Sequence, residues 1–122
     1  GIELVDNKNN KILINGCKIY KNYYNGIFMK DNSDVLIEGC EIYENGNNKE
    51  DYPQIWVEGS NCEIRSTSVY NGVNATGICI YDESSRVRMK GVKTYNNKCG
   101  IFKPQKYELE EFSGCNIEDG IY

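Results

Sequence analysis

The sequence predicts an all-β protein, a parallel β-solenoid of about five coils with three short strands in each coil. Two observations predict it. A segment returns in phase along the chain, first as NGCKIYKN at 15–22 and then as EGCEIYEN at 38–45. Inside each repeat, apolar residues alternate with polar ones. Repetition of this kind is typical of solenoids, in which each unit buries its apolar face only against its neighbours.

Two anchors set the number of coils. The first segment returns more loosely at 65–72, 90–97 and 113–120. A second anchor, in most copies a Gly-Ile pair, keeps step with it at Gly1-Ile2, Gly26-Ile27, Gln54-Ile55, Gly77-Ile78, Gly100-Ile101 and Gly120-Ile121. Since both anchors recur together, we expect five stacked coils and the start of a sixth.

The alternation has a period of two, which indicates strands and leaves no room for a helix. In the second coil, for example, the residues expected to face inward are Ile27 and Met29, Val35 and Ile37, and Cys40 and Ile42. The corner between the second and third strands is predicted to need a positive φ, which glycine adopts without steric cost. That position holds Gly16, Gly39, Gly91 or Gly114, with Ser66 as the exception.

The Gly-Ile openings and the NGCKIYKN and EGCEIYEN turns resemble the repeats of the right-handed parallel β-helix superfamily. That superfamily includes pectate lyases, polygalacturonases, copper-chaperone-like periplasmic proteins and the sugar-binding and hydrolase-type repeats. The resemblance covers the whole chain and implies a right-handed coil, as does the general rule for parallel crossovers. It indicates fold far more than function.

Length and composition indicate a single domain, residues 1–122, and an opening without methionine suggests an excerpt of a longer chain. No apolar run approaches the ~18 residues of a membrane span, and no signal peptide is recognised. The net charge is -4 without a basic patch, so nucleic acid is not an expected partner. Open solenoid ends predict end-to-end self-association.

Four of the six cysteines are interpreted as core residues. Cys62 takes the inward slot that elsewhere holds Ile12, Val35 and Val87. Cys17, Cys40 and Cys115 share a repeat position that elsewhere holds Thr67 and Val92. A slot of this kind suits cysteine as a small buried hydrophobe; a disulfide or a metal site is the alternative. Unpaired thiols favour a reducing compartment, the cytoplasm.

No catalytic residue is assigned. The chain has no histidine, which excludes Ser-His-Asp and Cys-His catalysis, and no pair of acids stands out for glycoside cleavage. Asp6, Asp31 and Asp82 share a corner, where turn chemistry is favoured over a Ca²⁺ site. No other cofactor is expected.

The outward positions of the first strand are the candidate binding surface. They read Glu3, Phe28, Trp56, Cys79 and Phe102, and then Val5, Lys30, Glu58, Tyr81 and Pro104. Large aromatic residues facing outward indicate a contact surface, although cover by segments outside this chain and simple exposure are alternatives. In the enzymes that the chain resembles, the sugar groove runs along this face. The predicted binding residues are Phe28, Lys30, Trp56, Glu58, Tyr81 and Phe102.

A second outward column is expected to be structural and consists of Tyr20, Tyr43, Tyr70 and Tyr95.

These observations favour a non-catalytic recognition or scaffold module of a larger protein, binding a carbohydrate or a protein along the first-strand face. The alternative is a fragment of a polysaccharide lyase or glycoside hydrolase whose catalytic residues lie partly outside this chain.

Overall fold

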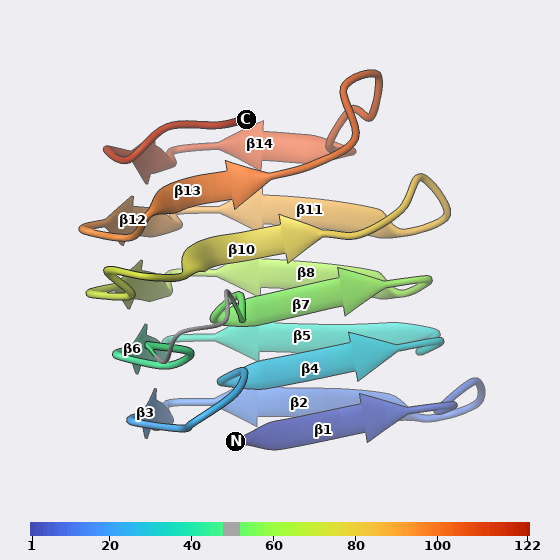
Figure 1. Ribbon diagram of the computed structural model, residues 1–122. Helices are drawn as coiled ribbons and strands as arrows, with labels where there is room; N and C mark the ends of the chain where they lie inside the picture. The colour runs from blue at the N-terminus through green and yellow to red at the C-terminus, as the bar shows by residue number, and fades with distance from the viewer. Residues whose placement is uncertain (48–51) are drawn as a thin grey trace.

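A computed structural model describes residues 1–47 and 52–122. Within these ranges the chain forms fifteen strands joined by turns and contains no helix, so no described helix is long and apolar enough to cross a membrane. The strands stack as the coils of a three-sided solenoid, with the chain ends at opposite ends of the stack (Figure 1). The all-β solenoid predicted from the repeat is confirmed.

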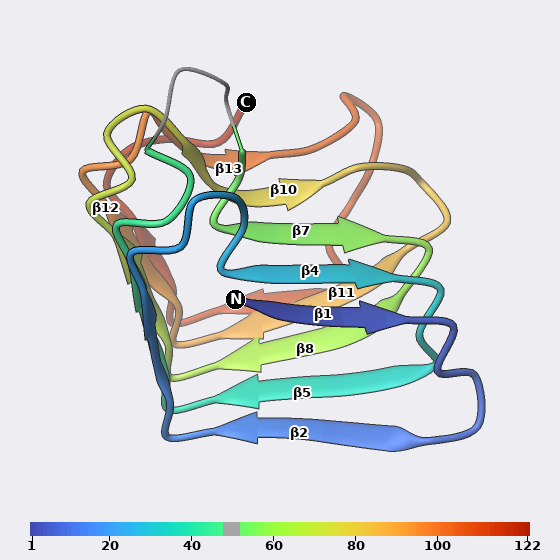
Figure 2. The same cartoon turned by 60° about the horizontal axis from the view of Figure 1, so that its bottom comes forward.

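Each side of the solenoid is one parallel sheet of five strands (Figure 2). Sheet A contains β1 (Ile2–Val5), β4 (Ile27–Lys30), β7 (Ile55–Glu58), β10 (Thr76–Ile80) and β13 (Cys99–Phe102). Sheet B contains β2 (Lys11–Asn15), β5 (Asp34–Glu38), β8 (Asn61–Arg65), β11 (Arg86–Lys90) and β14 (Glu111–Ser113). Sheet C contains β3 (Lys18–Tyr20), β6 (Glu41–Tyr43), β9 (Ser68–Tyr70), β12 (Lys93–Tyr95) and β15 (Asn116–Ile117).

The strands pair so that equivalent repeat positions lie next to one another. In sheet A this register makes a continuous inward column of Ile2, Ile27, Ile55, Ile78 and Ile101. Sheets B and C follow the same rule. Because every slot stacks on its counterpart, the core is a set of apolar columns that run along the solenoid axis.

Cys17, Cys40, Cys62 and Cys115 occupy the core slots that the repeat predicts. Cys40 and Cys62 are buried, whereas Cys17 and Cys115 are half-buried because they lie in the outermost coils. No disulfide joins the six cysteines. Burial raises the pKa of Cys62 to about 12, so its thiol stays protonated and unreactive at neutral pH.

The corner between sheets B and C has the predicted backbone conformation. Gly16, Gly39, Gly91 and Gly114 have φ between 61° and 65°. Ser66, the exception in sequence, keeps the same left-handed conformation with a φ of 47°. The bend therefore imposes the conformation on whichever residue stands there.

A ladder of buried amides runs along the corner between sheets C and A. Asn22 Nδ2 donates to Asn45 Oδ1 at 2.8 Å, and Asn45 Nδ2 donates to Gln54 Oε1 at 3.0 Å. Gln54 Nε2 then donates to Asn97 Oδ1 at 2.7 Å, and Asn97 Nδ2 to Asp119 Oδ2 at 2.7 Å. The ladder satisfies polar groups that would be costly to bury alone.

Gln54 enters this ladder because the third coil lacks an asparagine. The position equivalent to Asn45 is Gly72 there, and Gln54 reaches the gap from the residue just before β7. A Cβ at Gly72 would lie 2.8 Å from Gln54 Nε2. The amide of Gln54 therefore fits only because residue 72 is a glycine, and the missing asparagine side chain at that position is replaced by Gln54.

The outermost coils leave apolar residues partly uncovered. Ile2, Leu4 and Ile12 are half-buried in the first coil, and Phe112 is 44% exposed in the last. Tyr107, from the corner after β13, partly covers that last coil. Its hydroxyl accepts a hydrogen bond from the Val87 N–H at 3.0 Å and donates one to the Ser85 carbonyl at 2.8 Å.

Replacing Gln54 with alanine tests the amide ladder. Gln54→Ala leaves the Asn45 N–H without its buried partner, whereas the Tyr70 carbonyl keeps the Glu44 N–H. We expect the free energy of unfolding in urea to fall by about 1–3 kcal/mol, because an unmet buried polar group costs about that much. Asn74→Ala, at an exposed amide of the same corner, should change it by about 0.5 kcal/mol or less. Equal values for the two variants would contradict the ladder's role.

Self-association of the separate 122-residue chain stays a prediction. We expect the apparent mass in light scattering to rise with concentration, because the strand edges and apolar slots of the outer coils are open to pairing. Phe112→Lys should reduce this association by charging one end, whereas Leu13→Lys, on the outer face of sheet B, should not. A constant monomer mass at all concentrations would show that the ends do not pair.

Candidate binding face on sheet A

The outer face of sheet A carries the aromatic residues that the repeat predicts. Pairing aligns Glu3 with Phe28, Phe28 with Trp56, Trp56 with Cys79, and Cys79 with Phe102. The column is therefore continuous over five coils. These side chains point outward because their neighbours in sequence, such as Ile27 and Ile55, point into the core.

Three of the rings stack on one another. The Phe28 and Trp56 centroids are 5.9 Å apart with ring planes at 18°. Trp56 and Tyr81 are 4.8 Å apart at 27°, although Tyr81 comes from the neighbouring outward column. The stack covers Trp56 with a ring on each side, and covers Phe28 and Tyr81 with a ring on one side only.

The polar groups of this face are engaged with one another. Trp56 Nε1 donates a hydrogen bond to Glu58 Oε1 at 3.2 Å. Lys30 Nζ lies 3.7 Å from the other carboxylate oxygen of Glu58. Lys30, Trp56 and Glu58 therefore form one connected group, and the face presents little unbalanced charge.

The C-terminal half of the face is its most exposed part. Tyr81 is 57% exposed and Phe102 is 52% exposed. Cys79 lies between Trp56 and Phe102 in the column but is only 8% exposed, so it forms a floor between larger side chains. Five of the six predicted binding residues are linked by contacts, and Phe102 lies one coil beyond them.

Comparison with known proteins identifies the family. A family model described as "Right handed beta helix region" matches residues 1–117. This chain belongs to the right-handed β-helix family. Neither the curated proteins nor the solved structures that were compared gave a match. The family therefore establishes the fold and its hand, and the ligand has to be argued from the residues.

Sheet B of this β-helix has a self-neutralised outer face. Arg88 Nε lies 3.1 Å from Glu63, Arg86 Nε 2.5 Å from Glu110, and Lys90 Nζ 3.2 Å from Glu111. Burial acts to raise the pKa of Glu63, but hydrogen bonds from arginines on the same sheet outweigh it and lower the pKa overall. These charges are directed toward one another, which makes sheet B a poor candidate for ligand binding.

The tyrosine column of the β-helix lies on sheet C, as predicted. Tyr20, Tyr43, Tyr70 and Tyr95 stack with centroid distances of 4.8–4.9 Å and planes within 10°. The Tyr70 hydroxyl donates to Glu41 Oε1 at 3.0 Å. Burial, the hydrogen bond and the nearby carboxylate raise the pKa of Tyr70 to about 12.

The acids of the corner after sheet A take part in turns. Asp82 accepts hydrogen bonds from the Gly59 N–H at 3.1 Å and from the Ser84 hydroxyl at 2.8 Å. Asp6 and Asp31 are in the left-handed region, with φ of 58° and 57°. Among the described residues, no group of three or more His, Cys, Asp or Glu side chains could hold a metal ion.

A cluster of three tyrosines at the corner between sheets C and A was not predicted from the sequence. Tyr24 packs edge to face against Tyr23 and Tyr52, with centroids 4.9 and 4.7 Å apart. Tyr24 and Tyr52 also line a concavity of about 340 Å³ together with Glu3 and Phe28, at the N-terminal end of the sheet A face. The adjacent Tyr23-Tyr24 pair was the available signal, but it lies outside the repeated segments.

High pH tests the Tyr70 environment. The fold favours the neutral phenol, so its stabilising contribution is complete below the ordinary tyrosine pKa of about 10 and is lost as the pH rises toward 12. Wild type should therefore lose more unfolding free energy in urea between pH ~10 and ~12 than Tyr70→Phe does. Tyr43→Phe removes a hydroxyl from the same stack, keeps the Tyr70–Glu41 bond, and should behave like wild type. Equal losses in wild type and Tyr70→Phe would contradict this account.

Proposed function

We propose that this chain is a non-catalytic recognition module that binds a protein partner along the outer face of sheet A. The observation that carries the proposal is the outward aromatic row of Phe28, Trp56 and Tyr81, extended by Phe102. Contiguous outward aromatic residues with little charge are typical of protein contact surfaces. Most outer groups of sheets B and C are charge pairs or stacked tyrosines, and the exposed apolar residue of sheet B, Leu13, is aliphatic. Sheet A is the face that carries the outward row of Phe and Trp rings.

Ring geometry favours a protein over a carbohydrate on this face. A sugar ring lies flat on an open aromatic face, where its C–H groups meet the negative side of the ring. In the Phe28–Trp56–Tyr81 stack both faces of Trp56 and one face each of Phe28 and Tyr81 are directed toward a neighbouring ring. The exposed edges form a narrow apolar ridge, which suits the side chains of a partner protein. The test below must distinguish protein binding from carbohydrate binding on the same face.

The lyase or hydrolase alternative finds no support on this face. Its outward acids are Glu3 and Glu58, which lie in the first and third coils. Glu58 is engaged by Lys30 and Trp56, and glycoside cleavage needs two facing carboxyl groups. As part of the same proposal, six cysteines without a disulfide support a reducing compartment, the cytoplasm.

The exposed end of the face provides the cleanest variant. Trp56→Ala would remove the central ring, which stacks on both Phe28 and Tyr81, so a large stability loss would be mixed with any binding loss. Tyr81 stacks on Trp56 alone, and no ring stack of the described residues includes Phe102. Tyr81→Ala combined with Phe102→Ala removes the two most exposed rings of the face. We expect this variant to weaken binding of a purified partner at least ~30-fold, equivalent to about 2 kcal/mol. The partner is first captured by cross-linking, and its affinity is then measured by calorimetry.

Leu13→Ala is the matched control, because Leu13 is also an exposed apolar residue but lies on sheet B. It should leave the affinity unchanged, and both variants should melt as wild type does within a few degrees. If the control and the Tyr81/Phe102 variant bind the partner equally well, sheet A is not the binding face. A glycan array in which oligosaccharides bind wild type but not this variant would instead make the ligand a carbohydrate.

A further inference from the structure

The N-terminal end of the sheet A face is hollowed into a concavity of about 340 Å³. That volume lies within the range of small-molecule sites, roughly 300–1,000 Å³. Its walls come from β1, from β4 with the corner before it, and from the corner before β7. The lining residues that matter for binding are Glu3, Tyr24, Asn25, Phe28 and Tyr52.

Phe28 presents one ring face to this concavity. It lies between Glu3 and Trp56 in the outward column, and Trp56 stacks on one of its two faces with ring planes at 18°. The opposite face is therefore directed toward β1, and no ring stack of the described residues covers it. The face of an aromatic ring is negative and attracts a cation that lies within about 6 Å of the ring centre.

Two tyrosines form further walls of the concavity. Tyr24 and Tyr52 meet at 75° with centroids 4.7 Å apart, so their rings are adjoining walls and not a second stack. Tyr24 also packs edge to face against Tyr23, with centroids 4.9 Å apart. Two ring contacts thus hold Tyr24 in place beside the end of the aromatic row.

The polar groups of the lining are hydrogen-bond acceptors. Among the described lining residues Glu3 is the one charged side chain, and it takes part in none of their ion pairs. Asn25 Nδ2 donates to the Pro53 carbonyl at 2.6 Å, which leaves Asn25 Oδ1 as an acceptor. The Gly1 ammonium, which also lies at this concavity, donates to Asn22 Oδ1. A carboxylate and an amide oxygen beside a negative ring face suit a ligand that is a cation and a donor.

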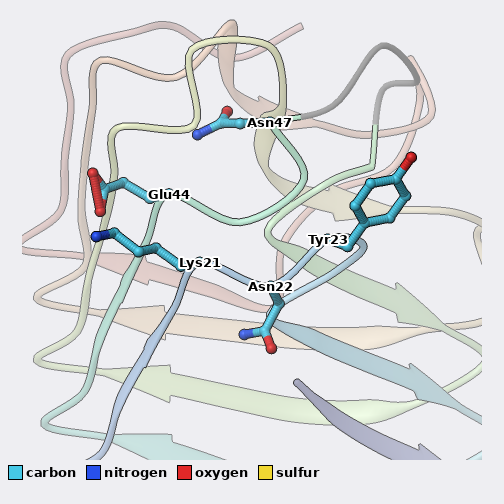
Figure 3. Close-up of a pocket in the computed structure, with 5 residues that line it drawn as sticks. All are labelled: Lys21, Asn22, Tyr23, Glu44 and Asn47. Carbon is cyan, nitrogen blue, oxygen red and sulfur yellow. The ribbon is translucent and has the colours of Figure 1, made fainter.

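Another concavity, at the corner between sheets C and A, differs in its charge. It has a volume of about 470 Å³ and is lined by Lys21, Asn22, Tyr23, Glu44 and Asn47. Lys21 and Glu44 extend in the same direction (Figure 3), so their opposite charges offset each other. Of these two concavities, the one beside Phe28 is therefore the one that attracts a cation.

We infer that the concavity beside Phe28 binds an arginine side chain of the protein partner. The guanidinium plane lies on the uncovered face of Phe28, two of its N–H groups donate to the Glu3 carboxylate, and a third donates to Asn25 Oδ1. Arginine suits these groups better than lysine, because its planar fork stacks on rings and binds a carboxylate through two parallel hydrogen bonds. The apolar stem of the arginine packs against Tyr24 and Tyr52. The inference rests on the partner proposed for sheet A and adds the chemistry by which that partner is recognised.

Blocked tripeptides test the site without the partner. Acetyl-Ala-Arg-Ala-amide is titrated to millimolar concentration into the isotope-labelled chain, and the backbone amide shifts are followed by NMR. The same peptide with citrulline has nearly the shape of arginine but no charge, and the same peptide with lysine keeps the charge without the fork. We expect the arginine peptide to bind at least fivefold more tightly than either, and to shift the amides of β1 and β4 more than those of β13.

Glu3→Gln removes the charge and keeps the size of the side chain. This variant should bind the arginine peptide at least fivefold more weakly, and its melting temperature should stay within a few degrees of wild type because Glu3 is exposed. Tyr24→Leu, which keeps apolar cover but removes the ring, should also weaken binding. Glu44→Gln is the matched control, since it makes the same change in the other concavity, and it should bind as wild type does.

Three results would overturn the inference. Wild type binds the arginine peptide no better than the citrulline peptide, or it binds the lysine peptide more tightly, or Glu3→Gln binds the arginine peptide as wild type does. The Tyr81/Phe102 variant should keep arginine-peptide binding, because those rings lie toward the other end of the face. Loss of partner binding in that variant supports the sheet A face whatever the peptides show, so the two proposals can fail separately.

Discussion

In-register parallel pairing places each side chain directly beside its counterpart in the next coil, about 4.8 Å away. Every position must therefore hold a residue that tolerates a near-identical neighbour. The isoleucine column of sheet A and the tyrosine column of sheet C are two solutions, since apolar and aromatic groups stack on themselves. Charged residues do not, and in one column of sheet B Glu63, Arg88 and Glu111 alternate in sign from coil to coil. In the next column Arg65 and Lys90 are adjacent like charges, and each is paired with a nearby glutamate.

The same constraint explains the buried amides. An amide is both donor and acceptor, so a column of amides can bond along its length without leaving an unpaired group. Gly72 interrupts the column of amides. There Gln54, from another part of the coil, bonds to both Asn45 and Asn97 and so keeps each of these buried amides paired. Corners tolerate such changes more readily than strands, since no ladder pairing fixes their length.

Ligand binding is consequently expected at side chains that do not pair or stack with their counterparts in the neighbouring coils. Sheet B pairs its charges and sheet C stacks its tyrosines, but sheet A ends in exposed Tyr81 and Phe102. The proposed binding face therefore lies on the side of the solenoid where outward rings remain exposed.

The sequence by itself determined the solenoid, the inward residues and the outward columns, because a period of two within a longer repeat leaves only one way to bury the apolar side chains. It predicted Phe28, Trp56 and Phe102 in one column for the same reason. Only the tertiary structure decided that Tyr81 leans across to stack on Trp56, that Gln54 fills the gap at Gly72, and that Tyr24 meets Tyr52. Those contacts join residues from different coils or columns, and they depend on side-chain rotamers and corner paths that local alternation does not specify.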